Sequence, residues 1–355
     1  MKKPDRILLL KMDHIGDALW SFPAIRALRA AFPAAVIDML CTPYLAGAFR
    51  RVSELTQVIE YDAAAPLDER QAVWRKMRDR TYHSAIVLGP VDKVNHLAFL
   101  SRAKERFGYA YSGNLFRSVA RVLFLTRRFD HPADIAAKSG LPLPHEVMAM
   151  LELVGKYGAS VPTHPTLFFP LTPDENKAAA ATLQKLLPGK ESFAALHLCA
   201  KSFSHGWNES TFAQLAKVLQ QVLPDAGWII TAGPAEAAVL ESYRPALAAA
   251  GIPVVSGMAL PPMAAILARM QVLVSWDTGV VHLASAVGTP VVDIFPAKDF
   301  DYCVQRWGPW GASGHPVHQK TEMLDAVTLD TIVREVREIV TPKQEESSRD
   351  HKGTC

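Results

Sequence analysis

Short apolar runs that alternate with helix-forming stretches constrain the fold of this chain more than any other feature. Residues 7–10 read Ile-Leu-Leu-Leu, a continuous apolar run typical of a strand buried on both faces of a parallel sheet. Apolar residues then recur at helical spacing from Ala24 to Phe32, and the run 36–40 predicts the next strand. Strand, helix and strand in this order indicate a βαβ unit with a right-handed crossover.

The same alternation starts again near residue 190, which indicates a second α/β unit. Ligands of such doubly wound sheets bind at the carboxyl ends of the strands, so each unit should present a binding edge. The further predicted strands are 58–59, 85–88, 193–198, 228–231, 254–255, 272–275 and 291–295, and the further predicted helices are 68–80, 209–223, 235–249, 261–268 and 277–286.

Three prolines within residues 161–170 separate the two series and are typical of a stiff linker. We therefore predict an α/β protein with two Rossmann-like doubly wound domains, 1–165 and 166–342, that face a central cleft. Residues 343–355 lack apolar periodicity and are predicted to form a disordered tail.

Charge is distributed unevenly along the chain. The total of 38 basic and 35 acidic residues is too balanced to indicate a nucleic-acid binder. Residues 1–165 hold 23 basic against 16 acidic residues, and most of the excess lies in residues 93–128, where aromatic residues are interleaved. This segment predicts a surface for an amphiphilic anionic partner or a membrane, although a solvated basic face over core aromatics explains it equally well. Its cations are Lys93, Arg102, Lys104, Arg106, Arg117, Arg121, Arg127 and Arg128, opposed by Glu105 alone.

Several classes of protein are disfavoured. The four cysteines are far apart and form no CxxC pair, which argues against a zinc knuckle, a redox motif or a disulfide scaffold. A signal peptide's apolar segment and a membrane-spanning run are both absent from the sequence, so we expect a cytoplasmic protein. The GxGxxG, GxxxxGK[ST], HExxH and GxSxG patterns are missing as well. We expect neither a bound metal nor a cofactor.

The most informative segment is 274–296. A predicted strand leads into Asp277, Thr278 and Gly279, which turn into a helix. Unpaired amides and the positive dipole at a helix N-terminus can hold a diphosphate, and Gly279 would let that backbone approach closely. His282 lies one turn further and should face the same mouth. Alternatively, Asp277 or Thr278 is merely a helix cap and His282 an ordinary semi-buried histidine.

Two segments resemble one family. Asp-Thr-Gly-Val-Val-His-Leu-Ala at 277–284, followed by Gly-Thr-Pro at 288–290, resembles the donor-site signature of family 9 glycosyltransferases, the ADP-heptose:lipopolysaccharide heptosyltransferases. Residues 7–33 resemble that family's opening segment, and the likeness extends from about residue 5 to about residue 340. It implies a GT-B fold, with the acceptor on the N-terminal domain and the nucleotide sugar on the C-terminal domain.

The resemblance also implies the reaction, an inverting, metal-independent transfer of heptose from ADP-heptose to the inner core of lipopolysaccharide. That acceptor is a phosphorylated lipid, so the enzyme would be peripheral on the inner membrane. An inverting transfer needs a general base for the acceptor hydroxyl. Gly16-Asp17, in the loop predicted for residues 11–17, matches the family's base, which makes Asp17 the candidate. Its alternatives are a capping role for Asp17 and the second carboxylate of the loop, Asp13.

The donor site departs from the family pattern at one point. The family's Lys-x-Trp-Pro segment is replaced by His205-Gly-Trp-Asn208. Lys201, with the hydroxyls of Ser202 and Ser204, is the candidate replacement for the missing lysine, unless it is an ordinary loop cation. Leaving-group charge must in any case be met by cations, amides and helix dipoles.

Glu236 completes the donor candidates. The segment Gly233-Pro-Ala-Glu236 matches the family's Gly-x-x-Glu, and a carboxylate can accept hydrogen bonds from two sugar hydroxyls. A first-turn glutamate stabilised by the helix dipole is an equal alternative. Residues 307–311 resemble a late loop of the family that shapes the cleft. The predicted donor site is Lys201, Ser202, His205, Glu236, Asp277, Thr278, Gly279 and His282, and the predicted acceptor site is Lys93, Arg102, Arg106, Arg117 and Arg121.

Three other functions stay open at this stage. A related GT-B glycosyltransferase would use another nucleotide sugar, and a sugar-nucleotide epimerase has a similar architecture. A nucleotide-sugar-binding protein with an idle base is the non-enzymatic alternative.

Overall fold

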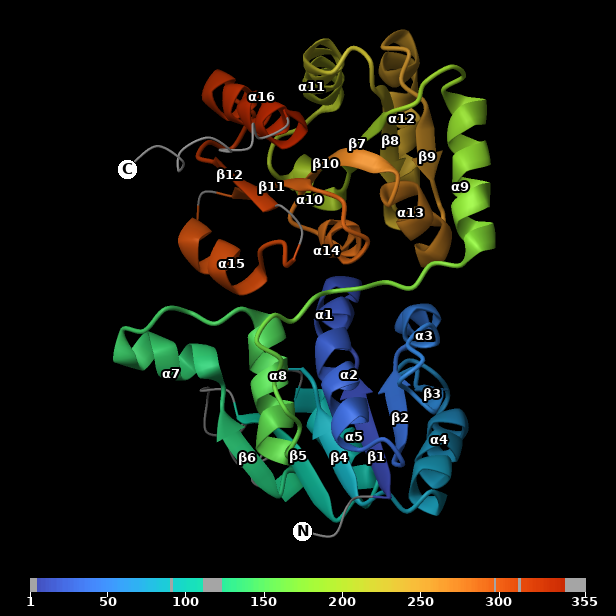
Figure 1. Ribbon diagram of the computed structural model, residues 1–355, viewed down its shortest axis with the longest axis vertical. Helices are drawn as coiled ribbons and strands as arrows, with labels where there is room; N and C mark the ends of the chain where they lie inside the picture. The colour runs from blue at the N-terminus through green and yellow to red at the C-terminus, as the bar shows by residue number, and fades with distance from the viewer. Residues whose placement is uncertain (1–4, 90–91, 111–122, 297, 312–313, 342–355) are drawn as a thin grey trace, which may run out of the picture.

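The two series of strands form two separate parallel sheets. The computed structural model describes residues 5–89, 92–110, 123–296, 298–311 and 314–341. The strand order is β3-β2-β1-β4-β5-β6 in the first sheet and β12-β11-β10-β7-β8-β9 in the second. Figure 1 shows the two sheets in two lobes stacked along the long axis, each flanked by helices. The first strand of each series therefore lies inside its sheet, as its apolar sequence requires.

The N-terminal lobe begins with the predicted βαβ unit and ends with a helix that leads to the linker. Its elements are β1 (Arg6–Lys11), α1 (Ile15–Trp20), α2 (Phe22–Ala31), β2 (Val36–Cys41), α3 (Pro43–Phe49), β3 (Gln57–Glu60), α4 (Leu67–Asp79), β4 (Ser84–Val87), α5 (Asp92–Leu100), β5 (Glu105–Ala110), β6 (Arg127–Asp130), α7 (Pro132–Ser139) and α8 (Glu146–Tyr157).

The C-terminal lobe repeats the alternation. Its elements are α9 (Pro173–Leu186), β7 (Phe193–Leu198), α10 (Ala200–Ser204), α11 (Glu209–Val222), β8 (Gly227–Ala232), η1 (Pro234–Glu236), α12 (Ala237–Ala249), β9 (Val254–Ser256), α13 (Leu260–Leu267), β10 (Met270–Trp276), α14 (Gly279–Ala286), β11 (Val291–Pro296), α15 (Phe300–Trp307), β12 (Gly314–Gln319) and α16 (Ala326–Val340).

One local prediction is wrong in a way that matters for the site. The segment expected to be a loop up to Asp17 becomes helical at Ile15, so Asp17 lies in the first turn of α1. The helix ends after six residues, where the Ser21 hydroxyl donates to the carbonyl of Ala18 at 2.6 Å. Such a short helix has no apolar periodicity of its own to reveal it.

The lobes are joined by packing as well as by the linker. An apolar cluster continues from α1, with Ile15 and Trp20, into α14, with Val281 and Leu283. The predicted boundary between residues 165 and 166 falls in a stretch that forms neither helix nor strand, and it stays a prediction. The predicted tail, 343–355, lies outside the described residues. Across the described part of the chain, no helix is both long and apolar enough to cross a membrane.

Candidate active site

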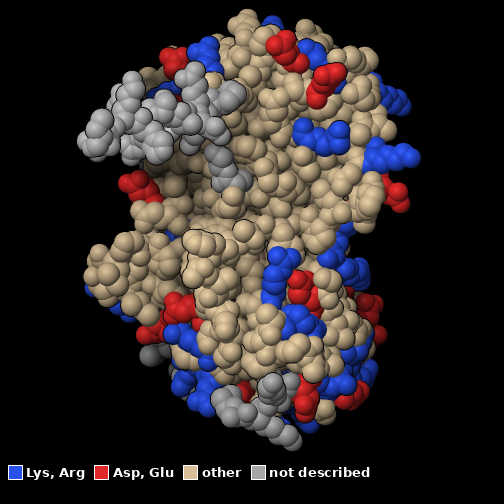
Figure 2. Space-filling model, viewed as in Figure 1, with Lys and Arg blue, Asp and Glu red and all other residues tan. Residues whose placement is uncertain are grey.

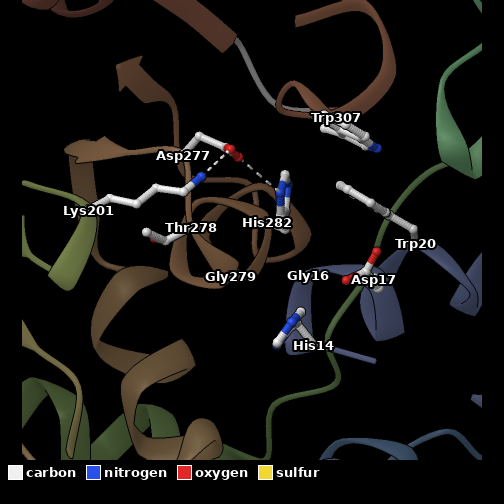
Figure 3. Close-up of a pocket in the computed structure, with 10 residues that line it drawn as sticks. All are labelled: His14, Gly16, Asp17, Trp20, Lys201, Asp277, Thr278, Gly279, His282 and Trp307. Atoms are coloured by element: carbon white, nitrogen blue, oxygen red, sulfur yellow. Dashed lines mark hydrogen bonds and ion pairs between the residues drawn. The ribbon is translucent and has the colours of Figure 1, made fainter. Parts of the chain in front are cut away.

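A cavity of about 320 Å³ lies where the two lobes meet. It opens at the carboxyl ends of β1 and β10, which are inner strands of their sheets, as expected for ligand sites of doubly wound folds. Figure 3 shows α1 on one side of the cavity and the start of α14 on the other. Its lining residues are His14, Gly16, Asp17, Trp20, Lys201, Asp277, Thr278, Gly279, His282 and Trp307.

Two glycines allow the lobes to approach closely beside the cavity. A Cβ atom placed on Gly279 would lie 2.2 Å from Cγ2 of Ile15, and one on Gly16 would lie 2.4 Å from Cδ2 of His282. Both values are far below an ordinary carbon–carbon contact of roughly 3.5–4.0 Å. Gly279 therefore lets α14 approach the other lobe closely, while its predicted approach to a diphosphate stays a prediction.

Asp17 presents the carboxylate on the N-terminal side of the cavity. Figure 3 places it beside Trp20, across the cavity from Lys201 and Asp277. Burial raises the pKa of Asp17, and the nearby Lys11 ammonium partly opposes this shift. A raised pKa brings a carboxylate closer to the proton affinity that a general base needs near neutral pH.

Asp13, the competing carboxylate, is already engaged. The ammonium of Lys11, which is fully buried, lies 3.0 Å from Oδ2 of Asp13. The backbone N–H of Met12 donates to Oδ1 of the same carboxylate at 3.0 Å. Asp13 is not among the residues that line the cavity. Of the two carboxylates, only Asp17 is placed to meet a ligand there.

The start of α14 forms the opposite side of the cavity. Lys201 Nζ lies 2.6 Å from Oδ2 of Asp277, so an ammonium stands at the helix N-terminus. The backbone of Thr278 occupies the capping position, yet its side chain makes no capping hydrogen bond. The Asp277 carboxylate is used by Lys201 instead. These contacts disagree with the alternative that Asp277 or Thr278 serves only as a helix cap.

His282 faces the cavity as a neutral ring. It is buried, and burial together with the charges of His145 and Lys201 lowers its pKa to about 3. Its Nε2 lies 3.8 Å from Oδ1 of Asp277. In the described part of the chain, neither Nδ1 of His282 nor Oγ1 of Thr278 has a hydrogen-bond partner, although both atoms are buried. The N-terminus of α14 thus has its backbone amides, the ammonium of Lys201 and the two unpaired polar atoms around it, an arrangement suited to binding an anion.

A family model described as glycosyltransferase family 9 (heptosyltransferase) matches residues 70–330. The chain belongs to glycosyltransferase family 9. It is 18% identical over 294 residues to the lipopolysaccharide core heptosyltransferase OpsX of Haemophilus influenzae. The aligned region covers 82% of this chain and 79% of OpsX.

Solved structures show the fold. A family 9 glycosyltransferase from Veillonella parvula matches with a TM-score of 0.74 and 17% identity, over 94% of this chain and 99% of that one. The E. coli heptosyltransferase WaaC with ADP matches with a TM-score of 0.70 and 20% identity, over 94% and 99% of the two chains. The predicted GT-B architecture of this family 9 glycosyltransferase is therefore confirmed.

Three predicted donor residues lie outside the cavity lining. The ring of His205 stacks on Trp276 with centroids 4.5 Å apart. The hydroxyl of Ser202 is buried and donates to the carbonyl of Cys199. Glu236 accepts a hydrogen bond from the backbone N–H of Ala200 at 3.2 Å. The structure thus brings together Lys201, Asp277, Thr278, Gly279 and His282 at one cavity, and donor contacts of all eight residues stay predictions.

The predicted acceptor residues do not gather at the cavity. Arg102 and Arg106 lie at the amino end of β5, opposite to the carboxyl ends that face the other lobe. The guanidinium of Arg106 donates to the carbonyls of Ala103 and Phe124. Arg117, Arg121 and the side chain of Lys93 lie outside the described residues. An acceptor-binding role for these five stays a prediction.

Two aromatic residues and a histidine were not among the predicted site residues. His14 and Trp20 lie one turn before and after Asp17, a helical spacing that would have found them had α1 been predicted. Trp307 is the last residue of α15 and lines the cavity. It belongs to the segment 307–311, which is expected from its sequence to shape the cleft. Trp20 also packs edge-on against His282, with ring centroids 4.6 Å apart.

A candidate group of metal ligands lies elsewhere. His315, Glu335 and Glu338 each offer a ligand atom within 4.8 Å of the others, on β12 and α16. Arg334 already pairs with both glutamates, and none of the three lines the cavity.

Proposed function

We propose that this family 9 glycosyltransferase transfers a heptose from ADP-heptose to the inner core of lipopolysaccharide with inversion at the anomeric carbon. The observation that carries the proposal is that Asp17 and the N-terminus of α14 line one cavity from opposite lobes. A general base and a diphosphate site must stand on either side of the anomeric carbon for an in-line displacement.

Asp17 is the proposed base. Its carboxylate takes the proton of an acceptor hydroxyl while that oxygen bonds to the anomeric carbon and the bond to the diphosphate breaks. The raised pKa of Asp17, caused by burial, favours this proton transfer. General base catalysis of this kind contributes about 10²–10⁴-fold to the rate.

The leaving ADP gains negative charge, and the proposed donor site stabilises this charge. The amides at the start of α14, the hydroxyl of Thr278 and the ammonium of Lys201 offer donors in a partly enclosed place. Lys201 takes the role of the family lysine that the chain lacks at position 205, and Asp277 holds its ammonium at the helix mouth. His282, being neutral, can donate one hydrogen bond without competing for the cation.

Donor and acceptor are proposed from the relatives. WaaC was solved with ADP, and OpsX is described as acting on the lipopolysaccharide core. An acceptor of that kind is an anionic lipid, so the enzyme would work at the inner face of the cytoplasmic membrane. The basic excess of the N-terminal half agrees with this. Figure 2 shows more charged side chains on the lower, N-terminal lobe than on the upper one.

The test is transfer by the purified full chain. The protein is incubated with heptose-deficient lipopolysaccharide core and, in parallel, ADP-heptose or UDP-, GDP- and CMP-sugars, and the glycan product is analysed by mass and anomeric configuration. We expect one added heptose, inverted, from ADP-heptose alone and without added metal. Transfer from another nucleotide sugar would replace the proposed donor, and binding of ADP-heptose without transfer to any core acceptor would favour a binding protein.

A further inference from the structure

A second large hollow lies at the opposite end of the N-terminal lobe. Its volume is about 450 Å³, and it is bordered by the last turns of α4 and by the segments that lead into β4 and β5. These segments stand at the amino ends of the strands, whereas the candidate active site stands at the carboxyl ends. We call it the basic hollow, and the residues that carry the argument are Arg75, Arg78, Asp79, Thr81, Arg102 and Lys104.

Four cations and one carboxylate line the basic hollow, a net charge of +3. Among the described residues, none of these four cations lies within ion-pair distance of a carboxylate. The neighbouring Arg80 differs, because it pairs with Asp38 at 2.7 Å. Within the described residues, the four cations of the hollow are therefore not held in ion pairs, and Asp79 is the carboxylate that lines the hollow with them.

The negative C-terminal ends of two helices offset part of this positive charge but not all of it. The C-termini of α4, at Asp79, and of α5, at Leu100, lie at this edge. Each helix C-terminus carries about −0.5 of an elementary charge. Two such ends offset about one of the three net positive charges, so the hollow keeps roughly +2 for a ligand.

The backbone of the hollow is also unusual. Thr81 and Arg102 have left-handed φ angles of 49° and 58°, and the third non-glycine residue of this kind in the described chain is Asp299. That conformation is sparsely populated by any residue except glycine and especially by β-branched ones. Thr81 and Arg102 follow the C-caps of α4 and α5, where a left-handed residue is common but is usually glycine, so the surrounding structure must hold the two non-glycine residues in place.

We propose that the basic hollow binds a phosphate-bearing ligand of two or more negative charges, at a site separate from the cavity between the lobes. Guanidinium groups pair with phosphate oxygens in bidentate fashion, and Arg75, Arg78 and Arg102 supply three. This inference does not depend on the proposed function, because it uses no residue of the cavity between the lobes. The phosphate is carried by either a soluble ester or an anionic lipid headgroup.

Calorimetry with inorganic pyrophosphate tests the proposal on the full chain. The variant R75Q/R102Q removes two cations of the hollow, and K138Q/K156Q removes two exposed cations of the same lobe outside it. Both variants keep any pyrophosphate site at the N-terminus of α14. A difference in pyrophosphate affinity between them therefore comes from the basic hollow. We expect R75Q/R102Q to raise the Kd at least tenfold or to lose one bound pyrophosphate, and the control to match wild type within twofold.

Equal affinity and stoichiometry for the two double variants, at matched Tm, would overturn the proposal. R78Q/K104Q gives an independent second comparison and should weaken pyrophosphate binding in the same direction. A sedimentation assay with phosphatidylglycerol and phosphatidylcholine vesicles then separates the sources. Loss of phosphatidylglycerol binding in R75Q/R102Q alone assigns a lipid headgroup, and unchanged vesicle binding with loss of pyrophosphate binding assigns a soluble ester.

Discussion

Replacing Gly279 by alanine should push the lobes slightly apart and slow transfer strongly without unfolding the protein. The added Cβ would lie 2.2 Å from Cγ2 of Ile15, about 1.3 Å closer than a carbon–carbon contact near 3.5 Å allows. Ile15 cannot simply turn away, because it is buried and its branched side chain is stiff at χ1. α1 and α14 must therefore move apart by about 1 Å, and a misplacement of that size costs about 10²-fold in rate.

The assay is kcat/KM for sugar transfer, with donor affinity and Tm measured on the same samples. A matched control is Gly47→Ala in α3, where an added Cβ meets no atom within 4 Å. This control should keep wild-type kcat/KM and gain roughly 0.5–1 kcal/mol of stability. The double variant I15A/G279A removes the clashing group and should recover part of the lost rate. Wild-type activity of a folded Gly279→Ala variant would refute the close approach of the lobes during catalysis.

Two further predictions concern buried carboxyl groups. Burial alone would raise the pKa of Glu146, but His131 and Arg306 outweigh burial and lower the pKa to about 2. This contact between the lobes should therefore stabilise the protein fully above about pH 4.5, and the stabilisation should be lost as the pH falls toward 2. Glu146→Gln should then lower the free energy of unfolding by about 3 kcal/mol at pH 7 and flatten its acid limb in urea titrations; an unchanged acid limb would contradict the pairing. Burial, with the charge of Asp277, raises the pKa of Asp293 well above its ordinary value, so stability present at low pH is lost as pH rises. Urea unfolding at pH 4 and pH 8 should favour Asp293→Asn over wild type increasingly at the higher pH, and a constant difference would argue against a protonated Asp293.

The side of the cavity formed by α14 could be predicted because its signals are local. A buried strand, a turn with Gly279 and a helix follow one another within a few residues, and the topology of a parallel sheet fixes which edge they occupy. Lys201 and Asp277 come after neighbouring strands, β7 and β10, so their side chains meet at the same edge.

The remaining errors come from elements that periodicity does not reveal. β5 has no continuous apolar run, so the sequence could not show that Arg102 and Lys104 precede a strand and lie at its amino end. The predicted acceptor residues therefore rest on the charge of residues 93–128 alone, without regard to which edge of the sheet they occupy. Contacts between the lobes, such as Glu146 with Arg306, join residues far apart in the chain and leave no local pattern.

The proposed roles of the two sides of the cavity, with Asp17 as the base and Lys201 binding the donor, are tested most directly by measuring ADP-heptose affinity and transfer rate in two variants. We predict that Asp17→Asn keeps the donor Kd within about twofold while the rate falls about 10²–10⁴-fold. Lys201→Ala should instead raise the donor Kd about tenfold or more, the expected loss of a hydrogen bond to a charged group. Full transfer by Asp17→Asn, or an equal loss of donor affinity in both variants, would contradict the account.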